Sequence, residues 1–271
     1  MTQPAMFLAH GSPTLAIEDN NYTQFLKQLI QQLPRRPRAV VVFSAHFDLP
    51  VQAVSNDNVH ETMHDFYGFP EEMYGIHYPA PGDRELSKQI GDLFADNNLP
   101  YEMSSGRGLD HGVWVLLRTL FPKADVPVVE LSVDSRRSPA EQYAIGKMLT
   151  RLRQENVLVI GSGGLVHNLR LLESGASSPA DWAVEFDEWI GEQLQDWNLR
   201  MLFDYERRAP HVRKAVPVYA NEHFAPLLYA MGAADDERRA VKLFQDYQYG
   251  SISLNCWVFG GTVSNDRMIR Y

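Results

Sequence analysis

The chain has little cysteine, and this scarcity limits its covalent chemistry. Among 271 residues the only cysteine is Cys256, so no disulfide can form within the chain, and the sequence is typical of a reducing compartment. Cys256 lies in an apolar run over residues 254–259. We therefore expect a buried, unreactive thiol rather than a nucleophile.

Positive charge is also scarce. Lysine and arginine total 25 against 34 aspartates and glutamates, which gives a net charge of −9. The densest basic stretch, residues 35–38, is interrupted by proline and is expected to be a solvated loop. Because binding to a phosphate backbone needs a basic surface, nucleic acid is not expected as a partner.

Long apolar runs are absent as well. No run approaches the roughly 20 residues that a membrane-spanning helix needs, and the N-terminus lacks the pattern of a secretory signal peptide. We expect a cytoplasmic protein that does not bind membranes. The composition, 45% hydrophobic and 22% charged, is that of a globular protein, and the absence of repeats or linkers predicts one catalytic domain over residues 1–271.

The pattern of apolar residues predicts an α/β fold. Continuous apolar runs are typical of buried strands, and amphipathic stretches between them are typical of helices. The predicted strands are residues 5–8, 39–43, 126–131 and 157–160, and the predicted helices are residues 22–32, 84–96, 113–120, 139–154 and 180–197. This alternation implies a central mixed, largely parallel sheet covered by helices on both faces.

One segment, residues 56–82, has little periodicity but contains three histidines and several aromatic residues. An irregular stretch of this length in a compact domain is usually functional. Within it His60 is expected at the surface, as is His211 in a polar stretch further along the chain.

Three of the nine histidines, His10, His46 and His167, lie just beyond predicted strands. In an open α/β sheet the carboxyl ends of the strands meet at one crevice. Each histidine alone is most simply a hydrogen-bonded residue, but three in the same position suggest a shared metal ion, because imidazole is a common ligand of zinc and iron. A metal-free site with a histidine base is the alternative, but neither Ser12 nor Ser44 lies in the Gly-x-Ser-x-Gly motif of serine hydrolases.

Two further histidines lie at predicted helix starts. His111 follows Asp110, which could cap the helix, and it is equally plausible that His111 reaches the crevice as an acid–base or substrate-orienting group. His223 begins an apolar helix, and Glu222 beside it favours a helix N-terminus electrostatically.

Several short segments together resemble the DODA-type extradiol dioxygenases of the LigB-like class III ring-cleavage superfamily, which include the 4,5-DOPA dioxygenases. The match runs in order from residue 6 to about residue 260. The segments are His10-Gly11-Ser12-Pro13, Ser44-Ala45-His46-Phe47, His64-Asp65-Phe66-Tyr67-Gly68-Phe69-Pro70, Tyr78-Pro79-Ala80-Pro81-Gly82, Gly108-Leu109-Asp110-His111-Gly112, Val166-His167-Asn168-Leu169-Arg170 and Glu222-His223.

The resemblance implies a LigB-like α/β fold with one divalent metal ion per chain, Zn2+ or Fe2+. His10, His46 and His223 match the metal ligands of the family. His167 matches the residue that acts as the acid–base group and that can also ligate the metal, and His111 matches a histidine that contacts substrate or bound oxygen.

The implied activity is the opening of the aromatic ring of a catechol-type substrate, such as DOPA, with both atoms of O2 incorporated. Fe2+ with open positions lets both catechol oxygens and O2 bind together, and a histidine suits the removal of a catechol proton. His64, Phe66 and Tyr67 of the irregular segment, together with Ser12, are expected to contact the substrate.

One departure from the wider superfamily concerns the third ligand. The protocatechuate-type branch has two histidines and a carboxylate, whereas the matching residue here is His223, with Glu222 adjacent. An all-histidine set also suits zinc, which has no redox chemistry. The alternatives are therefore a zinc-dependent hydrolase on the same scaffold and a non-enzymatic binding protein that keeps the fold. A binding protein would not need His167 and His111.

Overall fold

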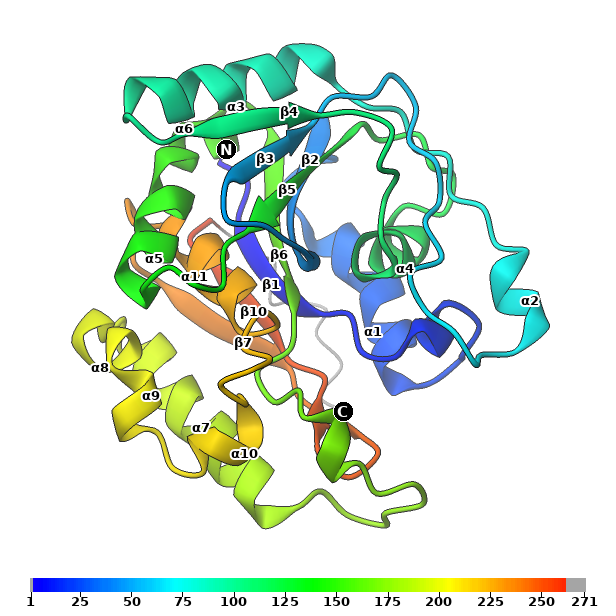
Figure 1. Ribbon diagram of the computed structural model, residues 1–271, viewed down its shortest axis with the longest axis vertical. Helices are drawn as coiled ribbons and strands as arrows, with labels where there is room; N and C mark the ends of the chain where they lie inside the picture. The colour runs from blue at the N-terminus through cyan, green and yellow to red at the C-terminus, as the bar shows by residue number, and fades with distance from the viewer. Residues whose placement is uncertain (1, 262–271) are drawn as a thin grey trace.

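An eight-stranded sheet forms the centre of the protein, whose computed structural model describes residues 2–261 (Figure 1). Its strands are β1 (Ala5–Ala9), β2 (Ala39–Asp48), β3 (Gln52–Ser55), β4 (Tyr101–Ser104), β5 (Val128–Val133), β6 (Val157–Gly163), β7 (Ala240–Phe244) and β10 (Cys256–Phe259). Side by side they follow the order β4-β3-β5-β2-β6-β1-β10-β7. Strands β5, β2, β6 and β1 run parallel, whereas β10 is antiparallel to both of its neighbours. The prediction of a mixed, largely parallel sheet is confirmed.

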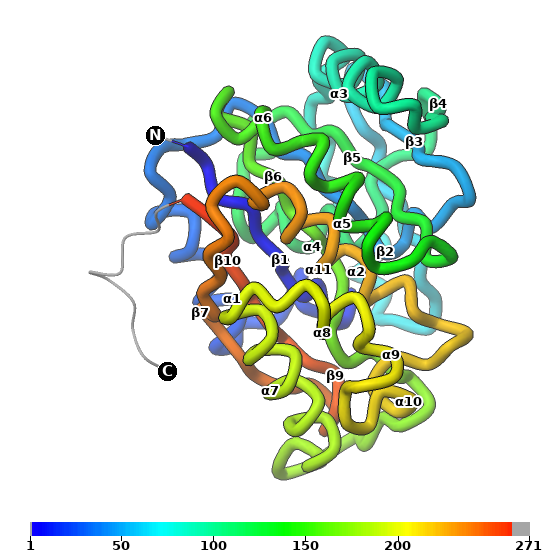
Figure 2. The backbone as a smooth tube through the Cα atoms, turned by 90° about the vertical axis from the view of Figure 1, so that its left-hand side faces the viewer, coloured from blue at the N-terminus to red at the C-terminus, as the bar shows by residue number. Residues whose placement is uncertain are grey.

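Helices cover both faces of the sheet. In chain order they are α1 (Asn21–Leu29), α2 (Glu71–Tyr74), α3 (Arg84–Asp96), α4 (His111–Leu120), α5 (Pro139–Met148), α6 (Thr150–Gln154), α7 (Asp181–Gln195), α8 (Leu199–Phe203), α9 (Tyr205–Arg208), α10 (Val212–Ala215) and α11 (Ala225–Gly232). Helices α1 and α4 pack on one face, and α5 and α11 pack on the other (Figure 1). Helix α7 packs on β7, and α8 to α10 continue along that side (Figure 2). A small hairpin, β8 (Tyr247–Gln248) and β9 (Ile252–Ser253), precedes β10.

The central strands supply apolar side chains to both layers because successive residues of a strand point to opposite faces. In β1, Phe7 packs in the cluster that contains α5, α7 and α11, whereas Met6 and Leu8 pack in the cluster that contains α1 and α4. This two-sided burial explains why the predicted strands are continuously apolar instead of alternating.

Local signals place the helix starts where the sequence predicts them. The carboxylate of Asp83 accepts a hydrogen bond from a backbone amide in the first turn of α3, which spans the predicted residues 84–96. Ser138 and Glu141 form a capping box at the start of α5. The predicted helix 139–154 is divided at Leu149 into α5 and α6.

Two predictions about histidines are wrong. His46 lies within β2, not beyond it, because the strand continues to Asp48; the pairing with β5 is irregular between Ser44 and Asp48. His60 is only 2% exposed instead of lying at the surface. Its ring is held against the sheet, where its Nε2 atom lies 2.9 Å from the carbonyl oxygen of Val128 on β5. His211 is at the surface as predicted, with its side chain 37% exposed.

The remaining expectations about buried and irregular segments are confirmed. Residues 56–82 are irregular apart from α2 and isolated bridges. Cys256 is fully buried, and burial raises the pKa of its thiol to about 12, as expected for an unreactive cysteine. Within residues 2–261, no helix combines the length and apolar character needed to cross a membrane.

Candidate metal centre

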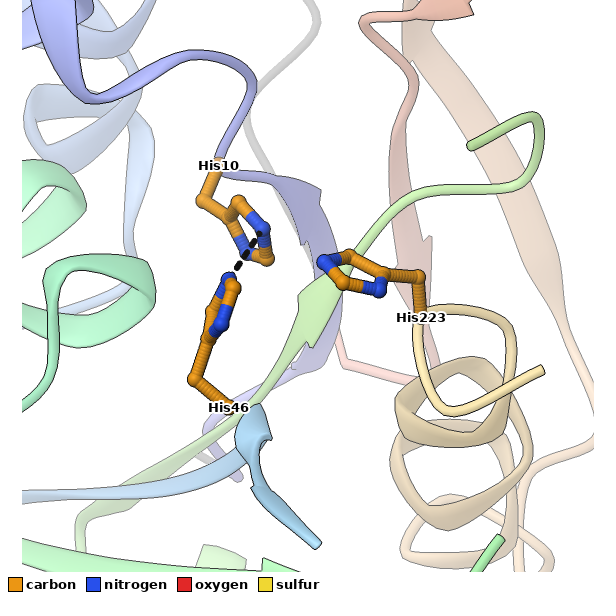
Figure 3. Close-up of side chains that lie close together, drawn as sticks. All are labelled: His10, His46 and His223. Carbon is orange, nitrogen blue, oxygen red and sulfur yellow. Dashed lines mark hydrogen bonds between the residues drawn. The ribbon is translucent and has the colours of Figure 1, made fainter. Parts of the chain in front are cut away.

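Three imidazole rings converge at the carboxyl end of the central strands (Figure 3). His10 directly follows β1, His46 lies near the end of β2, and His223 lies just before α11. The Nε2 atoms of His10 and His46 are 3.1 Å apart, and one ligand atom from each of the three rings lies within 4.8 Å of the other two. Because β2 and β1 both flank β6 and all three run parallel, their ends bring the first two histidines together.

The tautomer of His10 is fixed by a buried serine. The Nδ1 atom of His10 lies 2.9 Å from the hydroxyl oxygen of Ser162, and that hydroxyl donates its own proton to the carbonyl oxygen of Gly112. The serine oxygen is then available only as an acceptor, so His10 carries its proton on Nδ1. The Nε2 atom consequently presents a lone pair to the centre of the cluster.

Carboxylates face the Nδ1 atoms of the other two rings. The distance is 3.0 Å from His223 to Oε1 of Glu222 and 3.7 Å from His46 to Oδ2 of Asp65. A histidine that ligates a metal commonly donates its other N–H to such an acceptor. The Nε2 atom of His223 is buried and has no hydrogen-bond partner among the described residues.

A close backbone contact holds His223 against the sheet. Its carbonyl oxygen accepts a hydrogen bond of 2.9 Å from the amide of Gly164. A Cβ atom added at Gly163 would lie 2.2 Å from that oxygen, so only glycine fits at this position without displacement of the backbone. The glycine-rich end of β6 therefore allows the segment before α11 to approach the candidate metal centre.

Burial favours the neutral form of four of these histidines, His10, His46, His167 and His223. It is the main cause that lowers the pKa of His46 to about 4 and that of His167 to about 3, and it lowers the pKa values of His10 and His223 well below the usual range. Repulsion among the rings, should they become protonated, acts in the same direction. Neutral imidazole is the form that binds a metal or accepts a proton.

His167 lies beside the three converging rings. Its ring stacks on that of His223, with centroids 3.5 Å apart and planes 6° from parallel, and its centroid is 6.4 Å from that of His10. Among the described residues, His167 contributes no ligand atom to the group that His10, His46 and His223 form. Whether His167 acts as a base or as a fourth ligand stays a prediction.

His111 belongs to the same cluster. Its ring centroid is 4.0 Å from that of His46 and 5.5 Å from that of His10. Both its backbone amide and its Nδ1 atom lie within hydrogen-bond distance of Oδ1 of Asp65, at 2.9 and 3.0 Å. Burial alone would raise the pKa of Asp65, but the bonds from His111 lower it to about 2, so this carboxylate is ionised.

The alternative that Asp110 caps α4 is wrong. Its carboxylate makes no capping bond and instead accepts hydrogen bonds from the hydroxyl of Ser44 and from Arg107, at 2.8 and 3.0 Å. Arg107 also donates to Glu130 and to the carbonyl oxygen of His46, at 2.6 and 2.9 Å. This buried network supports the backbone at His46. The sequence feature that could have indicated this network is Glu130, a charged residue within the apolar strand β5.

The residues expected to contact a substrate lie in different surroundings. The rings of Phe66 and His111 are nearly perpendicular, with centroids 5.7 Å apart, whereas Tyr67 is 92% exposed. His64 bonds to a backbone carbonyl of its own loop, and Ser12 caps a short 3-10 helix over Pro13–Ala16. Substrate contact by these residues stays a prediction.

Comparison with known proteins finds one family and close relatives. The family described as "Catalytic LigB subunit of aromatic ring-opening dioxygenase" matches residues 4–256. The chain is 37% identical to the "4,5-DOPA dioxygenase extradiol" of Escherichia coli K12, over 93% of this chain and 92% of that protein. It is 35% identical to the protein of the same name from Beta vulgaris, over 94% and 96% of the two chains.

A solved structure has the same fold. The crystal structure of the uncharacterised protein JW3007 from Escherichia coli K12 superposes with a TM-score of 0.81 at 33% identity. The match covers 95% of this chain and all of that one.

Proposed function

Because the chain belongs to the family of catalytic LigB subunits of aromatic ring-opening dioxygenases, we propose that it opens the ring of a catechol by extradiol cleavage. The reaction would take place at one metal ion held by His10, His46 and His223. One observation carries this proposal. The three imidazoles converge, and each directs its Nδ1 atom toward an oxygen atom, which leaves the Nε2 atoms for a common ligand.

The donor set fits a divalent transition metal. A buried nitrogen without a hydrogen-bond partner, such as Nε2 of His223, is costly unless it binds something. Two imidazole nitrogens bonded to one ion at about 2.0–2.1 Å are at most about 4.2 Å apart, and the 3.1 Å between His10 and His46 satisfies this limit. Fe2+ at this site would supply the redox chemistry through which O2 reacts with a catechol.

The surrounding residues would manage protons and orient the ring. His167 is neutral and adjacent to His223, so it is placed to accept a proton from a catechol hydroxyl. His111 would contact the substrate from the His46 side, and Phe66 would pack against the aromatic ring beside it. His64, Tyr67 and Ser12 complete the proposed substrate contacts.

The names of the relatives point to the substrate. Four of them, from a bacterium and three plants, are called "4,5-DOPA dioxygenase extradiol". We infer a small catechol that carries a side chain, with DOPA as the first compound to test.

The test combines metal analysis with turnover. The protein is reconstituted with Fe2+ without oxygen and then given O2 and a panel of catechols that includes DOPA. We expect O2 uptake and a yellow ring-opened product, and loss of most bound metal in His10→Ala, His46→Ala and His223→Ala. His211→Ala, a surface histidine paired with Glu185, is the matched control and should keep its metal. Full metal content in all three variants, or no O2 uptake by the iron-loaded protein, would contradict the proposal.

A further inference from the structure

Asp65 connects the irregular segment 56–82 to the metal centre. Its Oδ1 atom contacts one residue twice, at 2.9 Å from the backbone nitrogen of His111 and 3.0 Å from Nδ1 of its ring. Its Oδ2 atom lies 3.7 Å from Nδ1 of His46. Although Asp65 as a residue is exposed, its side chain is only 20% exposed. One carboxylate therefore faces two rings of the cluster.

The backbone contact compensates for a missing cap. His111 is the first residue of α4, and Asp110 makes no capping bond to the amides there. Amides in the first turn of a helix have no partner within the helix, so a carboxylate from elsewhere in the chain can take one of them. Because Oδ1 of Asp65 contacts both the amide and the ring of His111, it holds the ring in one orientation relative to α4.

The ring contact selects a tautomer. An ionised carboxylate can only accept hydrogen bonds, so the nitrogen that faces it must carry the proton. We propose that Asp65 is a positioning residue that holds His111 as the Nδ1–H tautomer, with an Nε2 lone pair available to accept a proton or hydrogen bond from the substrate. This inference rests on the proposed function for the role of His111, but the tautomer itself can be tested without turnover.

A second cation is the competing interpretation of this cluster. His46, Asp65 and His111 also have ligand atoms close enough to hold an ion. The hydrogen-bonded arrangement is favoured because Oδ1 of Asp65 already accepts a hydrogen bond from the backbone amide of His111, a group that cannot ligate a metal. A second ion would have to replace the contact between Oδ1 of Asp65 and the ring of His111. In addition, the Nε2 atom of His46 is already directed toward the first site.

The test uses nitrogen-15 spectra of the zinc-loaded protein, in which long-range couplings distinguish the two tautomers of each histidine. The His111 signals are assigned by their loss in His111→Gln. Asp65→Ala removes the acceptor, whereas Asp65→Asn keeps an oxygen that can accept from Nδ1 without charge. Glu71→Ala, which removes an exposed carboxylate from the same segment, is the matched control.

We expect His111 of the wild-type protein and of Glu71→Ala to be the Nδ1–H tautomer. Asp65→Ala should shift it toward the Nε2–H form, and Asp65→Asn should restore the Nδ1–H form at least in part. In the iron-loaded enzyme, with the metal supplied at a saturating concentration, kcat should fall about 10–100-fold in Asp65→Ala, the usual size of the effect when an acceptor that orients a histidine of a metal site is lost.

Three results would overturn the inference. The first is an Nε2–H tautomer of His111 in the wild-type protein, a measurement that does not depend on the folding of any variant. The second is an unchanged tautomer in Asp65→Ala. The third is binding of two zinc ions per chain that falls to one in Asp65→Ala, which would make Asp65 a metal ligand. If the wild-type enzyme opens no catechol, the proposed function fails, but the tautomer result still decides the role of Asp65.

Discussion

Acidification of the metal-free protein should destabilise it partly through His167. Burial lowers the pKa of His167 to about 3 in the folded protein, whereas an unfolded histidine has a pKa of about 6.5. Between these values the unfolded chain binds a proton that the folded protein does not bind. The stabilising effect of the neutral ring is therefore complete above about pH 6.5 and is lost as the pH falls toward 3.

The size of this loss of stability follows from how far the pH lies below the pKa of the unfolded histidine. Each pKa unit is worth about 1.4 kcal/mol, so a change from pH 7 to pH 5 should cost about 2 kcal/mol of stability through His167 alone. Asp187 acts in the opposite direction: burial raises its pKa to about 7, so the folded protein binds a proton there as the pH falls. The pH dependence of the wild-type protein therefore mixes several groups, and only a comparison of variants isolates His167.

The informative variant is His167→Gln, which keeps a polar side chain of similar size but does not titrate. Urea unfolding of both proteins with a chelator, at pH 7 and pH 5, gives the four free energies of unfolding. We expect the wild-type protein to lose about 2 kcal/mol more than the variant. His211→Gln, which removes a surface histidine outside the cluster, is the control substitution. Equal losses in the wild-type protein and His167→Gln would refute the claim that His167 is a buried neutral ring.

Three further variants probe the metal centre. His167→Ala should keep the metal but lower kcat by about 10²–10⁴-fold, by loss of a positioned base; loss of metal in the elemental analysis would instead make His167 a ligand. Gly163→Ala places a Cβ atom against the carbonyl oxygen of His223 and should lower the free energy of unfolding by about 1–3 kcal/mol and weaken zinc binding; unchanged zinc affinity in a competition titration would contradict this. Ser162→Ala removes the acceptor for Nδ1 of His10 and should weaken zinc binding about 10–100-fold; the same titration checks it, and wild-type affinity would show that the serine does not orient the ring.

The sequence by itself determined the fold class and the place of the first candidate metal ligands. The runs that form β1, β2, β5 and β6 are continuously apolar because both faces of these strands are covered, and this pattern is local. His10 follows such a run directly, and the parallel order of the strands brings the ends of β1 and β2 to one place. The starts of α3 and α5 could be predicted for the same reason, since their capping residues lie within four positions of the amides that they bind; the start of α4 has no such local cap.

Only the tertiary structure decided which groups hold these histidines in place. Asp65 and His111 are 46 residues apart, Arg107 and Glu130 are 23 residues apart, and His60 contacts a carbonyl 68 residues away. None of these pairs leaves a trace in the periodicity of the sequence, because a hydrogen bond between distant segments depends on where the packed layers bring their backbones. The convergence of the candidate metal ligands could therefore be predicted from strand ends and family motifs, whereas the partners that set their tautomers could not.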